Sequence, residues 1–185
     1  MTTSRKFAAF TKNGRDGLGV SEVPKDGFCI SVFLIIRERD SPHRILMGRI
    51  NPHADWAHIG ALTRDRIEAH SGGWMLPSCH LIYGESPHDA ARRIVREQLA
   101  LDRELNLAAP KVYSEVYAPE RHPAAKEHWD LQFLFEGELG TKELQGMKKP
   151  NAWRTLEFVD VGTLDKTEFA RSHEDIIARV DRLRP

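Results

Sequence analysis

The 185-residue chain has almost no excess charge, little cysteine and no long apolar run. Its 27 lysines and arginines balance 27 aspartates and glutamates, so the formal net charge at pH 7 is zero. Long nucleic acids and anionic membrane surfaces attract proteins through an excess of positive charge. No apolar stretch approaches the length of a membrane span. We therefore expect neither long nucleic acid nor a membrane as a partner.

Cysteine occurs only twice, at Cys29 and Cys79, which match neither a disulfide framework nor the ligand spacing of a metal site. Several histidines precede the second cysteine, but their spacing fits no compact zinc motif, which favours a solvated loop. The first residues lack the apolar core of a signal peptide. These features together predict a cytoplasmic location.

What is present fits an ordinary globular domain, with 41% hydrophobic and 29% charged residues. Residues 1–27 are polar and rich in glycine, which predicts an N-terminal arm. Residues 28–185 then form a single domain. Asn51-Pro52 opens an insertion or long loop at 51–70, in which residues 62–69 favour a short helix.

Hydrophobic patterning predicts the elements of that domain. Residues 28–36 read as a strand that is apolar on both faces, as expected where helices cover a sheet on each side. Residues 44–50 predict its antiparallel partner. Further strands are expected at 111–117, 129–138 and 153–161, with a polar loop at 119–127 and a polar connection at 138–150. Residues 167–183 predict a terminal amphipathic helix.

The stretch Trp74 to Leu101 is the most informative part of the chain. It predicts a short strand, a glycine-containing turn at 83–85, and a helix with several start signals. Ser86 suits the N-cap, Pro87 the first helical position, and Asp89 the acidic position of a capping box.

This stretch resembles the box of the Nudix (MutT-like) hydrolases, which act on nucleoside diphosphates linked to another moiety. That box reads Gly, five residues, Glu, seven residues, Arg-Glu, an aliphatic, any residue, Glu-Glu, any residue, Gly and an aliphatic. Placed over 79–101, it is matched at five of its nine defined positions, namely Glu85, Arg93, Val95, Glu97 and Leu101. The flanking residues Trp74, Leu76, Pro77, Gly84 and Ala90 are also common in the family.

The departures lie where the family does its chemistry. Cys79 and Ala100 replace the two glycines, while Ile94 and Gln98 replace two of the three helix glutamates. In the family these glutamates bind magnesium or manganese. Loss of two carboxylates removes two negative charges from the patch, so the resemblance is to a degenerate box that binds metal weakly. Ile94 itself reads as a core residue of an amphipathic helix.

The resemblance implies a set of metal ligands and catalytic residues. Mg²⁺ or Mn²⁺ would be held by Glu97, by the amide oxygen of Gln98 and by the backbone carbonyl of Cys79. Glu97, Arg93 and Glu85 are the candidate catalytic residues. In the family the residues matching Arg93 and Glu85 hold the loop and helix together, so a structural role for this pair is the alternative, as is a surface ion pair between Arg93 and Glu97.

The expected substrate contacts lie outside the helix, at Trp74, Arg49, Glu120 and Trp129. For the tryptophans Trp56, Trp129 and Trp153, a core role competes with stacking on a nucleobase. A general base or an additional metal ligand is expected from Glu115, Glu120 or Glu127, each of which can equally be a solvated side chain.

The resemblance implies an α/β fold, a Nudix-like α/β/α sandwich with a mixed β-sheet. It implies a small nucleotide-type ligand and a possible homodimer. Three functions remain open: a metal-dependent hydrolase of nucleoside diphosphate derivatives, a catalytically silent Nudix fold that binds a nucleotide or metabolite and has a regulatory role, and a purely structural domain. In this fold the loops determine the substrate, and their sequences here do not indicate which one it is.

Overall fold

The computed structural model describes residues 28–117, 128–148, 150–171 and 173–181. The described residues divide into two compact units, one formed by residues 28–29, 114–117 and 128–131, and the other by residues 30–113 and the described residues from 132 to 181. The predicted arm at 1–27 and the predicted loop at 119–127 lie outside the described residues. The proposed domain boundary at residue 28 therefore stays a prediction.

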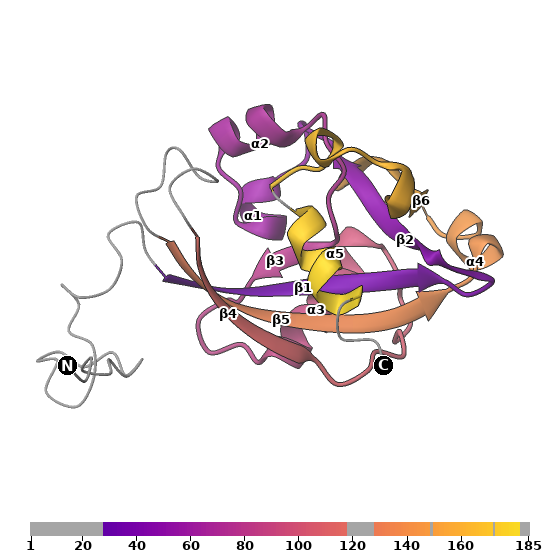
Figure 1. Cartoon of the computed structure of the whole chain (residues 1–185), viewed down its shortest axis with the longest axis horizontal. Coiled ribbons are helices and arrows are strands. Elements are labelled where there is room, and N and C mark those ends of the chain that lie inside the picture. The colour runs from indigo at the N-terminus through magenta and orange to yellow at the C-terminus, as the bar shows by residue number, and fades with distance from the viewer. Residues whose placement is uncertain (1–27, 118–127, 149, 172, 182–185) are drawn as a thin grey trace, which may run out of the picture. The chain divides into compact units, whose positions relative to one another are not determined.

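The described strands form one six-stranded sheet (Figure 1). Five of them follow the order β4-β5-β1-β2-β6, and β3 pairs with β1. The pairs β1–β2, β1–β3 and β2–β6 are antiparallel, whereas the arrows of β1 and β5 point the same way in Figure 1. The predicted mixed sheet is thus confirmed. The strands are β1 Phe28–Glu38, β2 Ser41–Ile50, β3 Ser78–His80, β4 Lys111–Tyr117, β5 His128–Leu139 and β6 Trp153–Asp160.

The described helices are α1 Trp56–Gly60, α2 Arg64–His70, α3 Pro87–Gln98, α4 Thr141–Gln145 and α5 His173–Asp181, with 3₁₀ turns at Val161–Thr163 and Lys166–Glu168. The short helix expected at 62–69 is α2. The predictions missed α1 and α4, which are too short to show a hydrophobic period. No helix in the described part of the chain is long and apolar enough to cross a membrane.

The terminal helix begins later than predicted, at His173 instead of residue 167. The backbone of Trp74 explains the difference, because its N–H donates to the carbonyl of Glu168 and its carbonyl accepts from the N–H of Ala170. These two bonds hold Phe169 in an extended conformation, as its backbone angles show. The helix can start only after that bridge.

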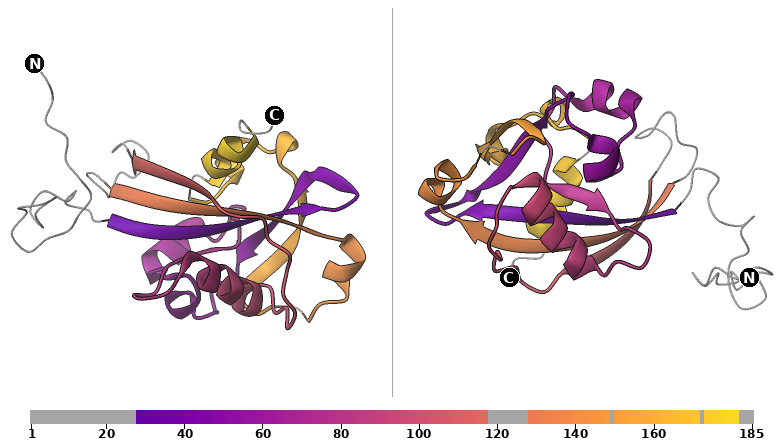
Figure 2. Two further views of the ribbon diagram at one scale, coloured as in Figure 1. Left: turned by 90° about the horizontal axis from the view of Figure 1, so that it is seen from below. Right: turned by 180° about the vertical axis from the view of Figure 1, so that it is seen from behind.

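In the larger unit, β1 has two buried faces, as its sequence predicts. Val32, Leu34 and Ile36 pack in one cluster with the apolar side of α3. Phe33 and Ile35 pack in another cluster with α5. Figure 2 shows α5 on one face of the sheet and α3, with α1, on the other. This arrangement confirms the helix, sheet, helix layering of the predicted sandwich.

The insertion at 51–70 closes a third cluster beside α3. Trp56 and Trp153 are fully buried and meet edge to face, with ring centroids 4.9 Å apart. The indole N–H of Trp56 donates to the carbonyl of Ala152 at 3.0 Å, and that of Trp153 donates to the carbonyl of Gln98 at 2.8 Å. The core role expected for these two tryptophans is confirmed, and the insertion is anchored to the end of α3.

Candidate functional site

The start of α3 follows its sequence signals. Ser86 is the N-cap, and its hydroxyl oxygen accepts from the backbone N–H of Asp89 at 3.1 Å. The same hydroxyl donates to the Asp89 carboxylate at 2.6 Å, which is the main reason that the pKa of this carboxyl lies below its usual value. Capping fixes where the helix begins, and with it the register of every side chain along it.

Arg93 and Glu85 join the helix to the loop before it. The Nε and Nη2 atoms of Arg93 donate to the two carboxylate oxygens of Glu85, both at 2.8 Å. Nη2 also donates to the carbonyl of His80 at 3.0 Å, and Glu85 accepts from the backbone N–H of Ile82 at 3.0 Å. The hydrogen bonds from Arg93 hold the pKa of Glu85 below its usual value. This geometry is that of a structural clamp.

Cys79 is buried in β3, where it pairs with Val32 of β1. Its Sγ atom lies 3.2 Å from Nη2 of Arg93. Burial nevertheless raises the pKa of the thiol to about 11, so the group stays protonated at neutral pH and is a poor nucleophile. The metal ligand expected at this position is the backbone carbonyl, which belongs to a residue of the sheet ladder.

Ile94 belongs to the core. It is 1% exposed and packs in the cluster between α3 and β1. The core role expected for this residue is confirmed. Its hydrocarbon side chain offers neither a charge nor an oxygen to a cation. A carboxylate at this position would have to be taken out of water, which is costly.

Gln98 is 0% exposed, and both ends of its amide are hydrogen-bonded. Its Oε1 accepts from the N–H of Ser78 at 3.1 Å, while its Nε2 donates to the carbonyls of Ser78 at 2.7 Å and Ile59 at 3.4 Å. The amide therefore ties α3 to β3 and to α1. The sequence analysis missed Ser78 and Ile59, and the only signal for such partners was a glutamine on the buried side of an amphipathic helix.

Glu97 is the carboxylate of the box helix that remains. Its side chain is 27% exposed, and Oε1 accepts from Arg96 at 3.3 Å. Its Oε2 is buried and makes no hydrogen bond within the described part of the chain. The expected pairing of Glu97 with Arg93 is replaced by the pairs Arg93–Glu85 and Arg96–Glu97.

These donors allow a test of the metal that the resemblance implies. No group of three or more His, Cys, Asp or Glu side chains that could hold an ion is found among the described residues. A hard divalent cation prefers charged oxygens, and of positions 94, 97 and 98 only Glu97 offers one. The residues fit a contact from one carboxylate, and they do not fit a site of three carboxylates.

The backbone at Ala100 agrees with the placement of the box over residues 79–101. It has a φ of 52°, in the left-handed region that favours glycine. The Nudix box has glycine at this position, just past the end of its helix. The backbone thus keeps the turn that glycine normally makes, although the residue has changed.

A family comparison agrees with this geometry. The family model for the NUDIX domain matches residues 28–180. The chain belongs to the Nudix family. A search of curated protein sequences found no match. Membership of the Nudix hydrolases confirms the family and fold expected from the box, and it supports a hydrolase in general terms.

Solved Nudix structures share the fold at low sequence identity. A MutT protein from Methanosarcina mazei is 16% identical with a TM-score of 0.54, covering 87% of this chain and 96% of that one. The NUDIX domain of Shewanella oneidensis NrtR, complexed with ADP-ribose, is 11% identical with a TM-score of 0.53, covering 95% and 100%. A bifunctional NMN adenylyltransferase/ADP-ribose pyrophosphatase from Francisella tularensis is 16% identical with a TM-score of 0.50, covering 88% and 43%.

Two of the expected substrate contacts meet each other. The guanidinium of Arg49 lies 4.5 Å from the ring centroid of Trp74, a favourable cation–π distance. Trp74 is 7% exposed and packs in the cluster that includes α5. In this Nudix domain α3 covers the other face of the sheet, so the structure does not bring this pair to the Glu97 side of the helix.

The other expected contacts belong to the smaller unit or lie outside the described residues. Trp129 packs on Phe28, with ring centroids 4.9 Å apart, and its indole N–H donates to Ser114 at 2.8 Å. Glu115 lies in β4. Glu120 and Glu127 lie outside the described residues, and their expected roles stay predictions.

Proposed function

We propose that this Nudix domain hydrolyses a phosphoanhydride in a nucleoside diphosphate linked to another moiety, and that it does so slowly because Glu97 alone supplies a carboxylate. The observation that carries the proposal is the buried Oε2 of Glu97, which lacks a hydrogen-bond partner in the described chain. A buried carboxylate oxygen without a partner is costly to maintain. Contact with a cation or a ligand proton would satisfy it.

The Arg93–Glu85 clamp supports the same proposal. It keeps the loop from His80 to Glu85 fixed against α3 through hydrogen bonds of 2.8 to 3.0 Å. A fixed loop is what a hydrolase needs in order to hold a diphosphate in one geometry. In this proposal Arg93 and Glu85 are positioning residues and Glu97 is the residue that touches the reacting groups.

Magnesium or manganese would be held by Glu97, with substrate phosphates and water completing its oxygen ligands, as is usual for Mg²⁺. When bound, such an ion neutralises charge that develops on the phosphate oxygens. The amide oxygen of Gln98 already accepts a hydrogen bond from the N–H of Ser78. Gln98 would therefore be a ligand only if this oxygen contacted the ion as well. The backbone carbonyl of Cys79 stays a candidate ligand.

The test is hydrolysis of dinucleoside polyphosphates, nucleotide sugars, ADP-ribose and nucleoside triphosphates with Mg²⁺ or Mn²⁺. We expect slow release of phosphate-containing products, and a loss of about 100-fold or more in Glu97→Gln, since the ion contributes several kcal/mol to such reactions. Glu68→Gln is the matched control, because Glu68 is an exposed carboxylate of α2 paired with Arg64. Turnover that is unchanged in Glu97→Gln would refute the role of Glu97.

A second candidate, a catalytically silent domain that binds a nucleotide or a related metabolite, is favoured by Ile94 and Gln98. One is core and the other is bonded to backbone on both sides of its amide. The NUDIX domain of NrtR was crystallised with ADP-ribose, which makes this compound a sensible first ligand. A rise in melting temperature with ADP-ribose in EDTA, together with no turnover, would establish this candidate and exclude the hydrolase.

The remaining expectations belong to the same proposal. A cytoplasmic location agrees with Cys29 and Cys79, which form no disulfide in the described chain. The thiol of Cys29 donates to the Asp130 carboxylate at 3.1 Å. We propose a small nucleotide-type ligand, no long nucleic acid, no membrane partner and a homodimer. Gel filtration with light scattering would test the last of these.

A further inference from the structure

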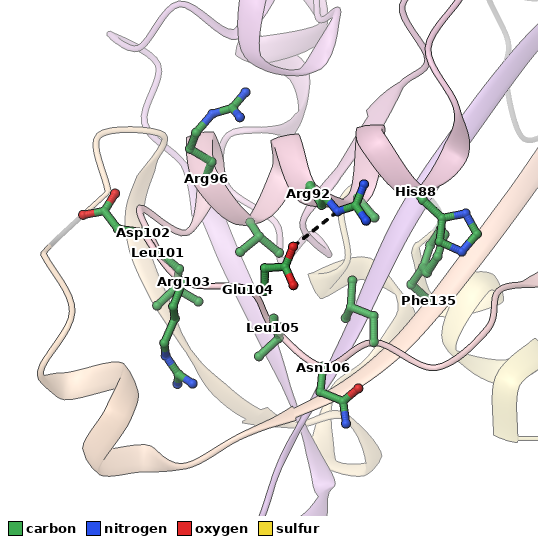
Figure 3. A pocket seen from close by; sticks show the side chains of 13 residues that line it. His88, Arg92, Arg96, Leu101, Asp102, Arg103, Glu104, Leu105, Asn106 and Phe135 are labelled. Carbon is green, nitrogen blue, oxygen red and sulfur yellow. Dashed lines mark ion pairs between the residues drawn. The ribbon is translucent and has the colours of Figure 1, made fainter.

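A pocket of about 560 Å³ lies along α3, between the helix and the segment 101–107 (Figure 3). This volume is within the range of small-molecule sites. From α3 it is lined by residues that include His88, Arg92 and Arg96. At 100° per residue, Glu97 lies half a turn around the helix axis from His88. The pocket is therefore on the opposite flank of α3 from the carboxylate of the box.

The floor of the pocket is apolar and its rim is charged. The rim carries three arginines, Arg92, Arg96 and Arg103, and two carboxylates, Asp102 and Glu104. Each arginine also pairs with a carboxylate beside the pocket, which is Asp89, Glu97 or Glu143 respectively. The floor is formed by Ala91, Val95, Leu101, Leu105, Leu107 and Phe135. An apolar surface with a few convergent polar groups is the usual composition of a ligand site.

The two ends of the pocket differ. At one end His88 meets Phe135 edge to face, with ring centroids 5.1 Å apart. Figure 3 shows Arg96 and Arg103 at the other end, with Asp102, and the guanidinium groups of the two arginines point away from each other. A neighbouring hollow of about 540 Å³ shares Arg103 and Asp102 and is also lined by Lys142, Lys148 and Glu143. Cations thus gather at the end away from the aromatic pair.

The arginines are held by ion pairs that a ligand could replace. Arg92 pairs with Asp89 at 2.9 Å and lies 3.8 Å from Glu104 across the pocket. Arg103 pairs with Glu143 at 2.6 Å. More than half of each arginine side chain is exposed, and such exposed pairs contribute little free energy. A phosphate can therefore compete for these guanidinium groups, which match its geometry.

We propose that this pocket is a second ligand site, for a small organic phosphate that has an aromatic or apolar part. The apolar part would lie near His88 and Phe135, and the phosphate near Arg103. The site goes beyond the proposed hydrolysis, because it lies on the other flank of α3 and uses no residue of the Arg93–Glu85 clamp and no metal.

AMP is the probe, with adenosine and inorganic phosphate as its two halves. Titration of the full chain in EDTA, followed by amide chemical shifts, should move the resonances of residues 101–107. Adenosine and inorganic phosphate should each bind at least about tenfold more weakly than AMP, since each lacks one part of the match. Adenosine binding as tightly as AMP would overturn the anionic end of the site.

Two variants break the same ion pair with opposite consequences. Arg103→Gln should weaken AMP at least about tenfold, the usual effect of losing a charge-assisted hydrogen bond. Glu143→Gln removes the competitor of the phosphate and should leave AMP binding equal or tighter. Equal losses in both variants would overturn the proposal, as would shifts confined to residues 78–85 and Glu97. That last result would still leave the proposed function standing, whereas hydrolysis without AMP binding in the pocket would refute only the second site.

Discussion

The substitution Gln98→Glu restores one carboxylate of the family's box at a fully buried position. The amide of Gln98 donates to the carbonyls of Ser78 and Ile59 and accepts from the N–H of Ser78. An ionised carboxyl would lose both donated bonds and face two carbonyl oxygens, so we expect it to bind a proton instead. A neutral acid keeps the acceptor and one donor, which makes protonation the cheaper outcome.

The expected loss of folding stability in Gln98→Glu depends on the pH. Holding a glutamate neutral at pH 7 costs about 1.4 kcal/mol for each unit above its unfolded pKa of about 4.3, or about 4 kcal/mol in all, and about 1 kcal/mol at pH 5. The folded pKa is raised, so the introduced group is favourable only below its unfolded pKa and destabilises increasingly as pH rises. Urea unfolding of the wild type and the variant at pH 5 and pH 7 measures this difference.

Gln98→Met is the matched control. It also removes the bonds to Ser78, but it carries no titrating group, so its loss of about 2 kcal/mol should be the same at both pH values. The reasoning is refuted if Gln98→Glu costs the same at pH 5 and pH 7, or less than about 1 kcal/mol at pH 7. If the new carboxylate can reach an ion beside Glu97, millimolar Mg²⁺ should recover part of the lost stability in Gln98→Glu and none in Gln98→Met. Adding Ile94→Glu would bury a second carboxyl, and we expect that double variant to fold only with the ion bound.

Three further predictions concern the frame around the site. Ala100→Gly should stabilise the fold by roughly 0.5–1 kcal/mol in urea unfolding, because Ala100 has a φ of 52°; a loss of stability would contradict the left-handed turn. Glu85→Gln should destabilise by about 3 kcal/mol, since it leaves the clamped guanidinium of Arg93 without its charge partner; a change below about 1 kcal/mol would show that the clamp is not a stabilising contact. The Nδ1 of buried His173 accepts from the N–H of Leu76 at 2.9 Å, and burial holds the pKa of this histidine well below its usual value. The neutral His173 contributes fully to the free energy of unfolding above about pH 6.5, and this contribution falls by about 1.4 kcal/mol per pH unit below that. His173→Gln should therefore make the free energy of unfolding less dependent on pH below about 6.5. Equal pH dependence in the variant and the wild type would contradict this.

The sequence was sufficient for the elements whose signals are local. The strand at 111–117 and the cap at Ser86 follow from neighbours a few residues away, and both occur as expected. The two-sided burial of β1 follows from a continuous apolar run. Patterns of this kind depend on the period of the element and on little else.

Contacts between distant segments could not be read from the sequence. The bond from Trp153 to the carbonyl of Gln98 joins residues 55 positions apart, and the bond from Gln98 to Ile59 joins residues 39 apart. The delayed start of α5 likewise depends on Trp74. The pairing of Arg49 with Trp74 was equally hidden. In each case the deciding partner belongs to another element, which a periodic pattern does not specify.

The Arg93 clamp also determines how a ligand would bind thermodynamically. Its guanidinium joins Glu85 and the carbonyl of His80 before any ligand arrives. A ligand at this loop therefore has few backbone torsions to freeze, and its affinity is spared the entropy that ordering a loose loop would consume. Amide hydrogens from His80 to Glu85 should then exchange nearly as slowly in the free protein as in the complex, which separates rigid recognition from loop closure.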